Sequence, residues 1–260
     1  MSNKGLLVVS FGTSVEETRE RTIGAIEKAL AAAFPEHRLY RAWTSGVIRR
    51  KLLRTVGLQI DSVEEALERM AADGVTELLV QPTHLLDGEE NRLMTEAIRA
   101  AAGRFAQVKI GAPLLVSPED LKALADAVSE ICPALGEDEL FAWMGHGSSE
   151  LKENVYVALN ELFAREGRKN MLVGTVEFEP GFEPIEEYIR SRKPRKVYLA
   201  PLMVVAGDHA VNDMSGDEDD SWKSCVAALG AEPVCILKGL GEYEAIHRLY
   251  VDHAKNAAAL

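Results

Sequence analysis

Two rounds of alternation between short apolar runs and amphipathic stretches constrain the fold of this chain most strongly. Runs such as Gly5–Ser10 and Glu139–Met144 are short and mostly apolar, which is typical of strands buried on both faces of a sheet. Amphipathic stretches with capping residues at their starts follow these runs. We expect the first to be one helix, capped by Thr13 or Ser14, that extends to about Phe34. Ser117 and Pro118 should open another helix, and the last helix is expected over Glu242–Ala259. Strands that alternate with helices form parallel sheets joined by right-handed crossovers. We therefore predict an α/β fold.

The pattern restarts near the middle of the chain, which indicates an internal duplication. The turn Phe11–Ser14 (FGTS) matches His146–Ser149 (HGSS) at an offset of 135 residues. The stretch Gln81–Glu90 matches Ala200–His209 at an offset of 119 residues. Repetition of a whole set of strands and helices predicts two structurally similar halves.

The two copies meet in the segment Pro133–Gly136, where proline and glycine interrupt the pattern. We therefore expect an N-terminal domain over residues 1–136 and a C-terminal domain over residues 137–260. Each domain should hold a four-stranded parallel sheet flanked by helices, with the active site in a cleft between the domains. Ligands of open α/β sheets bind beyond the carboxyl ends of the strands, so functional residues are expected there.

The charge balance narrows the classes of partner. The 260 residues carry a formal net charge of −12, and the isoelectric point is about 5.1. Nucleic-acid binders and proteins of anionic membrane surfaces present a basic face, so we expect neither partner. No run approaches the roughly 18 apolar residues of a membrane-spanning helix. A small anionic ligand stays compatible with a local basic pocket, and a homo-oligomer is compatible with the sequence.

The cysteines and the N-terminus are typical of a cytoplasmic protein. Cys132, Cys225 and Cys235 are odd in number and form no CxxC pair, so we expect neither disulfides nor a cysteine metal site. The apolar run before Gly12 is too short for a signal peptide. The sequence also lacks the nucleophile elbow GxSxG, the dinucleotide motif GxGxxG and the Walker-type P-loop. We predict no organic cofactor.

Three polar residues follow strands of the second copy. His146 follows the first of these strands, Glu177 follows the second and His209 follows the third. In the first copy, Phe11 and Glu90 occupy the positions of His146 and His209. Two imidazoles and a carboxylate are a normal ligand set for a divalent first-row metal. The histidines are alternatively general bases, because imidazole titrates near neutral pH.

Other interpretations of these residues remain open. A histidine beside glycine is often a hydrogen-bonded turn residue, and the turn His146–Ser149 also suits a phosphate at a helix start. The acidic run Asp217–Asp220, which follows His209 and Asp213, is either a solvated loop or a collector of cations. A metal-dependent hydrolase that uses the same histidines and glutamate is a further alternative.

Several motifs resemble a known family. In chain order they are LLVVSFGTS, TSGVIRRKL, QPTHLLDGEE, MGHGSS, VGTVE, PLMVVAGDHAVNDM and DSWK. In these stretches the chain is similar to the anaerobic sirohydrochlorin cobaltochelatases of the CbiK type, which are class II tetrapyrrole chelatases related in fold to ferrochelatase. The GDHAVNDM stretch is highly specific, and the matches cover essentially the whole chain.

The resemblance implies an activity and its residues. The activity is insertion of Co²⁺ into sirohydrochlorin, or into precorrin-2, in anaerobic cobalamin biosynthesis. Co²⁺ would be a substrate metal, with Fe²⁺ or Ni²⁺ as alternatives. The catalytic residues would be His146, Glu177 and His209, and all three would bind the metal. One of the two histidines, His146 in preference to His209, would also accept the pyrrole protons. A non-catalytic carrier of metal or tetrapyrrole is the alternative.

The resemblance also implies a substrate with many carboxylates, so cations must offset the negative charge of the protein. Arg49, Arg50 and Lys51 follow a strand end and are candidates for this task, as is Arg92 beyond Gly88. Their alternative is a solvated helix face. Backbone N–H groups at two expected helix starts are candidates too. His84 either contacts the substrate or is packed in the interior. The expected substrate-binding residues are Ser10, Phe11, Gly12, Thr13, Ser14, Arg49, His84, Glu90 and Ser148.

Overall fold

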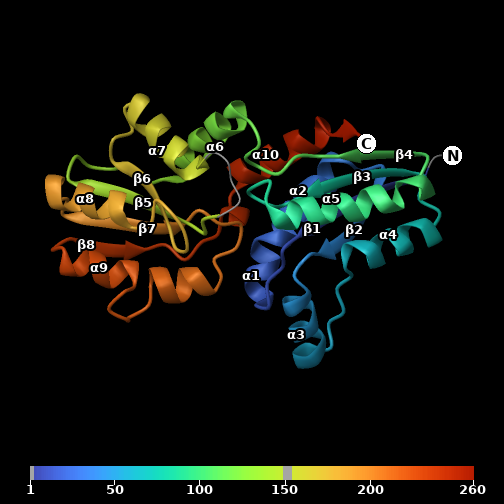
Figure 1. Cartoon of the computed structure of the whole chain (residues 1–260), viewed down its shortest axis with the longest axis horizontal. Helices are drawn as coiled ribbons and strands as arrows, with labels where there is room; N and C mark the ends of the chain where they lie inside the picture. The colour runs from blue at the N-terminus through green and yellow to red at the C-terminus, as the bar shows by residue number, and fades with distance from the viewer. Residues whose placement is uncertain (1–2, 149–153) are drawn as a thin grey trace. The chain divides into compact units, whose positions relative to one another are not determined.

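A computed structural model describes residues 3–148 and 154–260 (Figure 1). The chain divides into two compact units. Unit 1 comprises Met1–Asp120 together with Ile246–Leu260, and unit 2 comprises Leu121–Ala245. Each unit contains its own sheet, so each is described separately.

Unit 1 contains a sheet with the strand order β2-β1-β3-β4-β9. Its strands are β1 (Lys4–Ser10), β2 (His37–Trp43), β3 (Glu77–Pro82), β4 (Gln107–Ile110) and β9 (Ala258–Ala259). The first four are parallel, as predicted, and β9 adds a short antiparallel edge to β4. Short edge strands limit further pairing, which suits the end of a sheet.

Unit 2 repeats the arrangement with the strand order β6-β5-β7-β8. Its strands are β5 (Glu139–Gly145), β6 (Met171–Thr175), β7 (Lys196–Pro201) and β8 (Glu232–Cys235), and all pairs are parallel. β5 begins 135 residues after β1, and β7 begins 119 residues after β3. These are the offsets of the sequence repeat, so the internal duplication is confirmed at the level of strand order and register.

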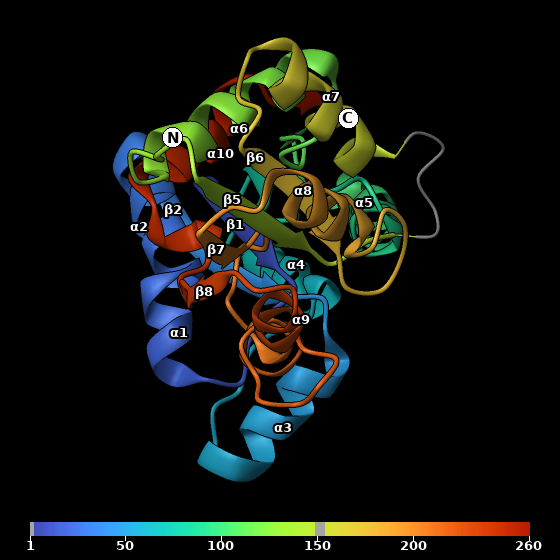
Figure 2. The ribbon, with the colours of Figure 1, turned by 90° about the vertical axis from the view of Figure 1, so that its left-hand side faces the viewer.

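Helices connect the strands of both units (Figure 2). In the N-terminal part they are α1 (Glu16–Arg21), α2 (Ile23–Ala33), α3 (Gly46–Val56), α4 (Val63–Ala72), α5 (Glu89–Ala101), the 3₁₀ turn η1 (Ala102–Arg104) and α6 (Pro118–Ile131). They continue as α7 (Val155–Arg165), α8 (Glu183–Arg192), the π turn η2 (Ala210–Met214), α9 (Trp222–Ala228), the 3₁₀ turn η3 (Leu240–Glu242) and α10 (Glu244–Lys255). None of the helices in the described ranges has the length and hydropathy needed to cross a bilayer.

The sequence explains where several helices start. Ser62 and Glu65 form a reciprocal capping box at the start of α4, which satisfies two backbone donors at once. Ser117 accepts a hydrogen bond from the backbone N–H of Asp120 at 3.1 Å and precedes Pro118, as predicted for α6. These local signals fix the helices, and the apolar faces then dock on the sheets.

Each unit has its own hydrophobic core. In unit 1 the strand residues Leu7 and Val80 pack with Leu67 of α4 and Met94 of α5. In unit 2 a separate buried cluster joins strands and helices through Leu140, Ala142, Met144, Val197, Leu199, Ile185, Ile189, Trp222 and Val226. Burial of this kind, worth about 25 cal/mol per Å² of apolar surface, holds the strand ends in place beside the functional residues.

The predicted first helix is broken in two. We expected one helix from the Phe11–Ser14 turn to about Phe34, but α1 ends at Arg21 and α2 begins at Ile23. The hydroxyl of Thr22 donates to the carbonyl of Thr18 at 2.6 Å, a back-bond that bends helices. The residue that caps α1 is Val15, without a side-chain hydrogen bond, so the expected cap by Thr13 or Ser14 is wrong.

The division of the chain differs from the expected boundary at residue 136. Helix α6 continues into unit 2, where Arg168 donates to the carbonyl of Ala125 at 2.6 Å. At the other end, Tyr250 of α10 donates to the carbonyl of Thr83 at 2.8 Å, which ties the C-terminus to unit 1. The expectation that the last helix reaches Ala259 is wrong, because residues 258–259 form β9.

Candidate metal centre

Three neighbouring strands of unit 2 deliver the three predicted metal ligands. His146 directly follows β5, and Glu177 lies two residues beyond β6. His209 follows β7, in helical conformation directly before the π turn η2. β5 pairs with β6 on one side and with β7 on the other, and all run parallel, so their carboxyl ends meet at one edge of the sheet. Residues far apart in sequence are thereby brought together.

The turn after β5 sets the position of His146. Gly147 has a φ of +94°, and a Cβ there would lie 3.0 Å from the backbone nitrogen and the ring of Phe178. Only glycine adopts such a conformation without strain. The N–H of Gly147 donates to the hydroxyl of the buried Tyr156 at 3.3 Å, and burial raises the pKa of Tyr156 to about 12. The turn that carries His146 is therefore held by a hydrogen bond to the neutral phenol of Tyr156.

The loops that carry His146 and Glu177 are also joined through the backbone. The N–H of Glu177 donates to the carbonyl of His146 at 3.1 Å, and the N–H of Val176 donates to that of Gly145 at 3.0 Å. These bonds continue the ladder between β5 and β6 past the strand ends. The imidazole and the carboxylate are thus held in register with one another.

Glu177 lies between the two imidazoles. Its Oε2 is 3.8 Å from Nδ1 of His146, and its Oε1 is 3.8 Å from Nε2 of His209. The two rings are 5.0 Å apart at 82°. One ligand atom from each of the three residues lies within 4.8 Å of the others. Two ligand atoms on one tetrahedral metal, with bonds of about 2.0–2.2 Å, are about 3.4 Å apart, so small side-chain movements complete a site.

The three side chains are accessible to solvent. The exposed fractions are 49% for His146, 43% for Glu177 and 31% for His209. A metal bound by them keeps positions open to water or to another ligand, which distinguishes an exchange site from a closed structural site. The set of two nitrogens and one carboxylate suits divalent first-row metals in general.

His209 has a further carboxylate partner that the sequence interpretation did not assign. Its Nδ1 lies 2.8 Å from Oδ2 of Asp213. The spacing of four residues was the available signal, since i and i+4 residues share a helical face.

The acidic run after Asp213 behaves as a solvated loop. Residues Asp217–Asp220 are exposed, and Asp217 forms an ion pair with Lys223 at 2.6 Å. The run adds no member to the group of candidate metal ligands found in the described ranges.

The predicted substrate contacts after β1 divide into buried and exposed residues. Ser10 and Thr13 are buried, and the hydroxyl of Ser10 accepts a hydrogen bond from Thr83 at 2.8 Å. Phe11 is half exposed and Ser14 is partly buried. Gly12 has a φ of +108° and lies against the ring of Trp43. The exposed Phe11 thus offers a side-chain surface, whereas Ser10 and Thr13 mainly join the strand ends.

His84 is packed in the interior of unit 1. It is 8% exposed, and neither ring nitrogen has a hydrogen-bond partner among the described residues. Burial lowers the pKa of His84 to about 4, and the adjacent side chain of Asn91 offsets only part of this effect. Of the two interpretations made from the sequence, the structure favours a neutral packed histidine.

Among the cations of α3, Arg49 is already paired. Its guanidinium lies 2.8 Å from the carboxylate of Glu65, so it is a less available substrate contact than expected. Arg50 and Lys51 are exposed and form no ion pair within the described part of the chain. They become the better candidates for carboxylate recognition.

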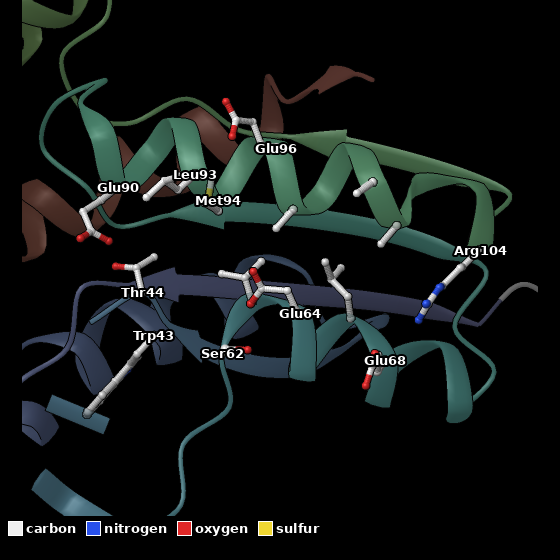
Figure 3. Close-up of a pocket in the computed structure, with 15 residues that line it drawn as sticks. Trp43, Thr44, Ser62, Glu64, Glu68, Glu90, Leu93, Met94, Glu96 and Arg104 are labelled. Carbon is white, nitrogen blue, oxygen red and sulfur yellow. The ribbon is translucent and has the colours of Figure 1, made fainter. Parts of the chain in front are cut away.

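Glu90 lines a groove of about 650 Å³ in unit 1 (Figure 3). The groove runs between α4 and α5, with Glu64 and Glu68 on one side and Leu93 and Met94 on the other. It contains none of the three candidate metal ligands. Ser148 lies partly buried beyond His146, and the residue that follows it, Ser149, is outside the described residues.

The three cysteines are free, in agreement with the sequence interpretation. Cys132, Cys225 and Cys235 are each partly buried, and burial raises the pKa of all three thiols, that of Cys132 to about 12. Protonated thiols of this kind are poor metal ligands. The candidate centre therefore consists of imidazole and carboxylate groups.

Comparison with known structures relates the fold to chelatases. SirB from Bacillus subtilis, solved with Fe³⁺, superposes with a TM-score of 0.66 over 98% of this chain and 95% of that one, at 16% identity. CbiX, described as the terminal enzyme of siroheme biosynthesis in denitrifying bacteria, gives a TM-score of 0.55 over 98% and 100%, at 18% identity. At these identities the comparison supports the fold.

Sequence comparison identifies nearer relatives. A sirohydrochlorin cobaltochelatase of Salmonella typhimurium is 39% identical over 254 residues, which cover 98% of this chain and 96% of the relative. The sirohydrochlorin cobaltochelatase CbiKC of Nitratidesulfovibrio vulgaris is 32% identical over 263 residues, covering 100% and 92%. The profile of the family described as cobalt chelatase (CbiK) matches residues 4–259. The chain therefore belongs to the CbiK family of cobalt chelatases.

Proposed function

We propose that this protein is a sirohydrochlorin cobaltochelatase, an enzyme that inserts Co²⁺ into sirohydrochlorin, and that precorrin-2 is a further substrate. The observation that carries the site assignment is the convergence of His146, Glu177 and His209, with one ligand atom of each within 4.8 Å of the others. Membership of the CbiK family and the names of the two relatives support the reaction.

The proposed mechanism follows from what insertion requires. The metal must exchange its water ligands for four pyrrole nitrogens, and two N–H protons must leave the ring. His146, Glu177 and His209 hold the incoming metal, and their exposure leaves positions through which ring nitrogens replace water. Glu177, between the imidazoles, supplies negative charge that keeps the cation in place while ligands exchange.

Proton removal needs a base beside the ring, and we assign this role to His146, whose nitrogen lone pair becomes free to take a proton once the metal has passed to the pyrrole nitrogens. It is the more exposed of the two histidines, and its Nδ1 lies 3.2 Å from the carbonyl of Gly147. Imidazole accepts a proton near neutral pH, which matches the requirement for an acceptor that can return the proton to water. No organic cofactor and no redox step enter this scheme.

The basic helix α3 supports recognition of an anionic substrate. Arg50 and Lys51 are exposed and without ion-pair partners in the described part of a chain whose net charge is −12. Such a local positive patch attracts carboxylates over several ångströms and raises the rate of encounter. We propose that α3 contributes in this way to the capture of sirohydrochlorin.

The proposal also includes the identity of the metal and the cellular location of the protein. The ligand set is compatible with Fe²⁺ and Ni²⁺ as well as Co²⁺, because affinity in this series does not by itself select one metal. We propose Co²⁺ as the physiological substrate, following the relatives. A biosynthetic enzyme of this kind is expected in the cytoplasm.

The experiment that tests the function is a turnover measurement. Sirohydrochlorin and Co²⁺ are mixed with a tenth of an equivalent of protein, and formation of cobalt-sirohydrochlorin is followed by its visible spectrum. The proposal predicts complete conversion, faster than without protein. Conversion that stops at the amount of protein added identifies a carrier, and an unchanged rate contradicts the proposal.

A further inference from the structure

The two ring nitrogens of His209 face different carboxylates. Nδ1 lies 2.8 Å from Oδ2 of Asp213, within hydrogen-bond distance. Nε2 lies 3.8 Å from Oε1 of Glu177, on the side of the candidate metal ligands. A neutral imidazole has one N–H donor and one lone pair. In this geometry Nδ1 of His209 carries the proton and donates a hydrogen bond to Asp213, and the lone pair on Nε2 faces the other candidate metal ligands.

The π turn η2 holds this pair in place. Ala210 and Met214 are fully buried and anchor the segment in the core of unit 2. At the start of the segment, the N–H of Val211 donates to the carbonyl of Gly207 at 3.1 Å. His209 and Asp213, four residues apart, lie on the opposite, accessible side of the turn. π turns of this type frequently accompany functional sites.

Within residues 3–148 and 154–260, His146 has no comparable carboxylate partner outside the ligand group. Its Nδ1 lies 3.2 Å from the carbonyl of the next residue, Gly147, and 3.8 Å from Glu177, which is itself a candidate ligand. The two imidazoles of the centre therefore differ in their surroundings. Only His209, among the described residues of the centre, has a carboxylate within hydrogen-bond distance that is not a member of the ligand group.

We propose that Asp213 is a positioning residue for His209. It accepts the Nδ1–H hydrogen bond, which fixes the ring orientation and the tautomer and so directs the Nε2 lone pair toward the metal. The inference rests on the proposed metal site. A carboxylate behind a metal-bound imidazole fixes the ring and makes the ligand more basic, and its removal typically weakens metal binding about 10–100-fold.

The test measures Co²⁺ binding without any tetrapyrrole. Calorimetric titration compares the wild type with Asp213→Ala and Asp213→Asn. Asp213→Ala should weaken Co²⁺ binding by at least about tenfold. Asp213→Asn should retain part of the affinity, because the amide oxygen still accepts the Nδ1–H bond. This near-isosteric variant also keeps the test valid if the alanine variant folds poorly.

Asp208 offers a matched control. It precedes His209, is exposed, and accepts a hydrogen bond from the side chain of Asn212 at 2.9 Å, another pair four residues apart. Asp208→Asn removes the same charge from the same segment without touching the imidazole. Co²⁺ affinity within about twofold of the wild type is expected for this variant. An equal loss in Asp208→Asn and Asp213→Asn would mean that net charge, not positioning, matters, and would overturn the inference.

A second comparison separates positioning from direct attraction of the cation. In a His209→Ala background, Asp213→Asn should cause no further loss of Co²⁺ affinity, because its effect passes through the imidazole. An undiminished loss in that background overturns the proposal. Nitrogen-15 spectra of the histidines provide an independent signature, since neutral His209 should carry its proton on Nδ1 in the wild type and lose this preference in Asp213→Ala.

Failure of the inference is distinguishable from failure of the proposed site. If His209→Ala weakens Co²⁺ binding and Asp213→Ala does not, the metal site stands and the role of Asp213 is refuted. If His209→Ala itself leaves Co²⁺ binding unchanged, the metal site is refuted together with the inference.

Discussion

At the scale of single residues, the candidate centre depends on side chains that are exposed and thus contribute little to stability. His146 and His209 lie beyond the strand ends and outside the buried core. Their removal should affect chemistry far more than folding, since surface substitutions away from structural features usually change stability by less than about 0.5 kcal/mol.

We therefore expect His146→Ala and His209→Ala each to reduce the rate of cobalt-sirohydrochlorin formation at least about 100-fold, in the range that removal of a positioned acid–base group costs. The thermal unfolding midpoint should stay close to that of the wild type. His37→Ala is a suitable control, because His37 lies at the start of β2 in unit 1 and belongs to no candidate site. Near-normal rates in either site variant would remove that residue from the mechanism.

Gly147 provides a prediction about the backbone. A Cβ at this position meets Phe178 at about 3.0 Å, and the φ of +94° strains any other residue. Gly147→Ala should destabilise the protein by about 1–3 kcal/mol and reduce metallation, because the turn carries His146. Gly103→Ala is the control, since a Cβ there meets no atom within 4 Å. Denaturant unfolding of both variants provides the measurement, and equal stability would refute the strain argument.

Because His84 is buried, we expect it to make the free energy of unfolding depend on pH. Its pKa is about 4 in the folded state and near 6.5 when unfolded, because burial disfavours the imidazolium. Between these values the unfolded state binds more protons, so stability falls as the pH decreases from about 6.5 to 4. The loss from this residue is on the order of 2–3 kcal/mol.

Unfolding in denaturant at pH 7 and pH 5 tests this point. His84→Gln should show a smaller loss of stability between the two pH values than the wild type. An identical pH dependence in both proteins would show that His84 does not carry the effect. The readout is the difference in unfolding free energy between pH 7 and pH 5 within each protein, not the absolute stability of the variant.

At the scale of helices and strands, much of the fold is predictable from the sequence. Apolar runs identify the parallel strands, and the repeat offsets of 135 and 119 residues reappear when the pairing of β1 with β3 is compared with that of β5 with β7. Caps such as Ser117 before Pro118 locate helix starts. Local signals suffice here because propensity, patterning and packing favour the same structure.

Features that depend on distant contacts were not predictable. The return of α10 to unit 1 rests on hydrogen bonds such as Tyr250 to Thr83, which have no local signature. The break at Thr22 and the π turn η2 likewise depend on competing hydrogen bonds within helical patterns. At the site, residue types indicated the ligand set, whereas the pairing of Arg49 with Glu65 and the burial of His84 required coordinates.

Helix α3 yields a prediction at this scale. Arg50→Glu combined with Lys51→Glu should raise KM for sirohydrochlorin several-fold and flatten its dependence on salt, because the attraction is ionic and screened within about 10 Å at 0.1 M salt. Lys28→Glu on the exposed face of α2 changes charge within the same unit and serves as the control. An equal rise of KM in the control would indicate a general effect of net charge.

At the scale of the whole molecule, the two similar halves differ in the residues that follow their strands. The same strand order occurs in both units, yet they differ in the histidines that the described residues place after the strands. Unit 2 carries the accessible His146 and His209 after its first and third strands, whereas the histidine after the third strand of unit 1, His84, is buried. Phe11 and Glu90 occupy the equivalent places in unit 1. The sheets are thus alike, and the two copies differ in a few residues beyond the strand ends; the proposed metal site rests on these residues in unit 2.

The assignment of the metal centre is tested most directly by locating cobalt in crystals of the protein grown with Co²⁺, by anomalous scattering at the cobalt absorption edge. The strongest peak is expected between His146, Glu177 and His209, at about 2.0–2.2 Å from a nitrogen of each histidine and an oxygen of the glutamate. This peak should disappear in His209→Ala. A strongest peak elsewhere, for example at the acidic loop Asp217–Asp220, would contradict the assignment of the metal centre.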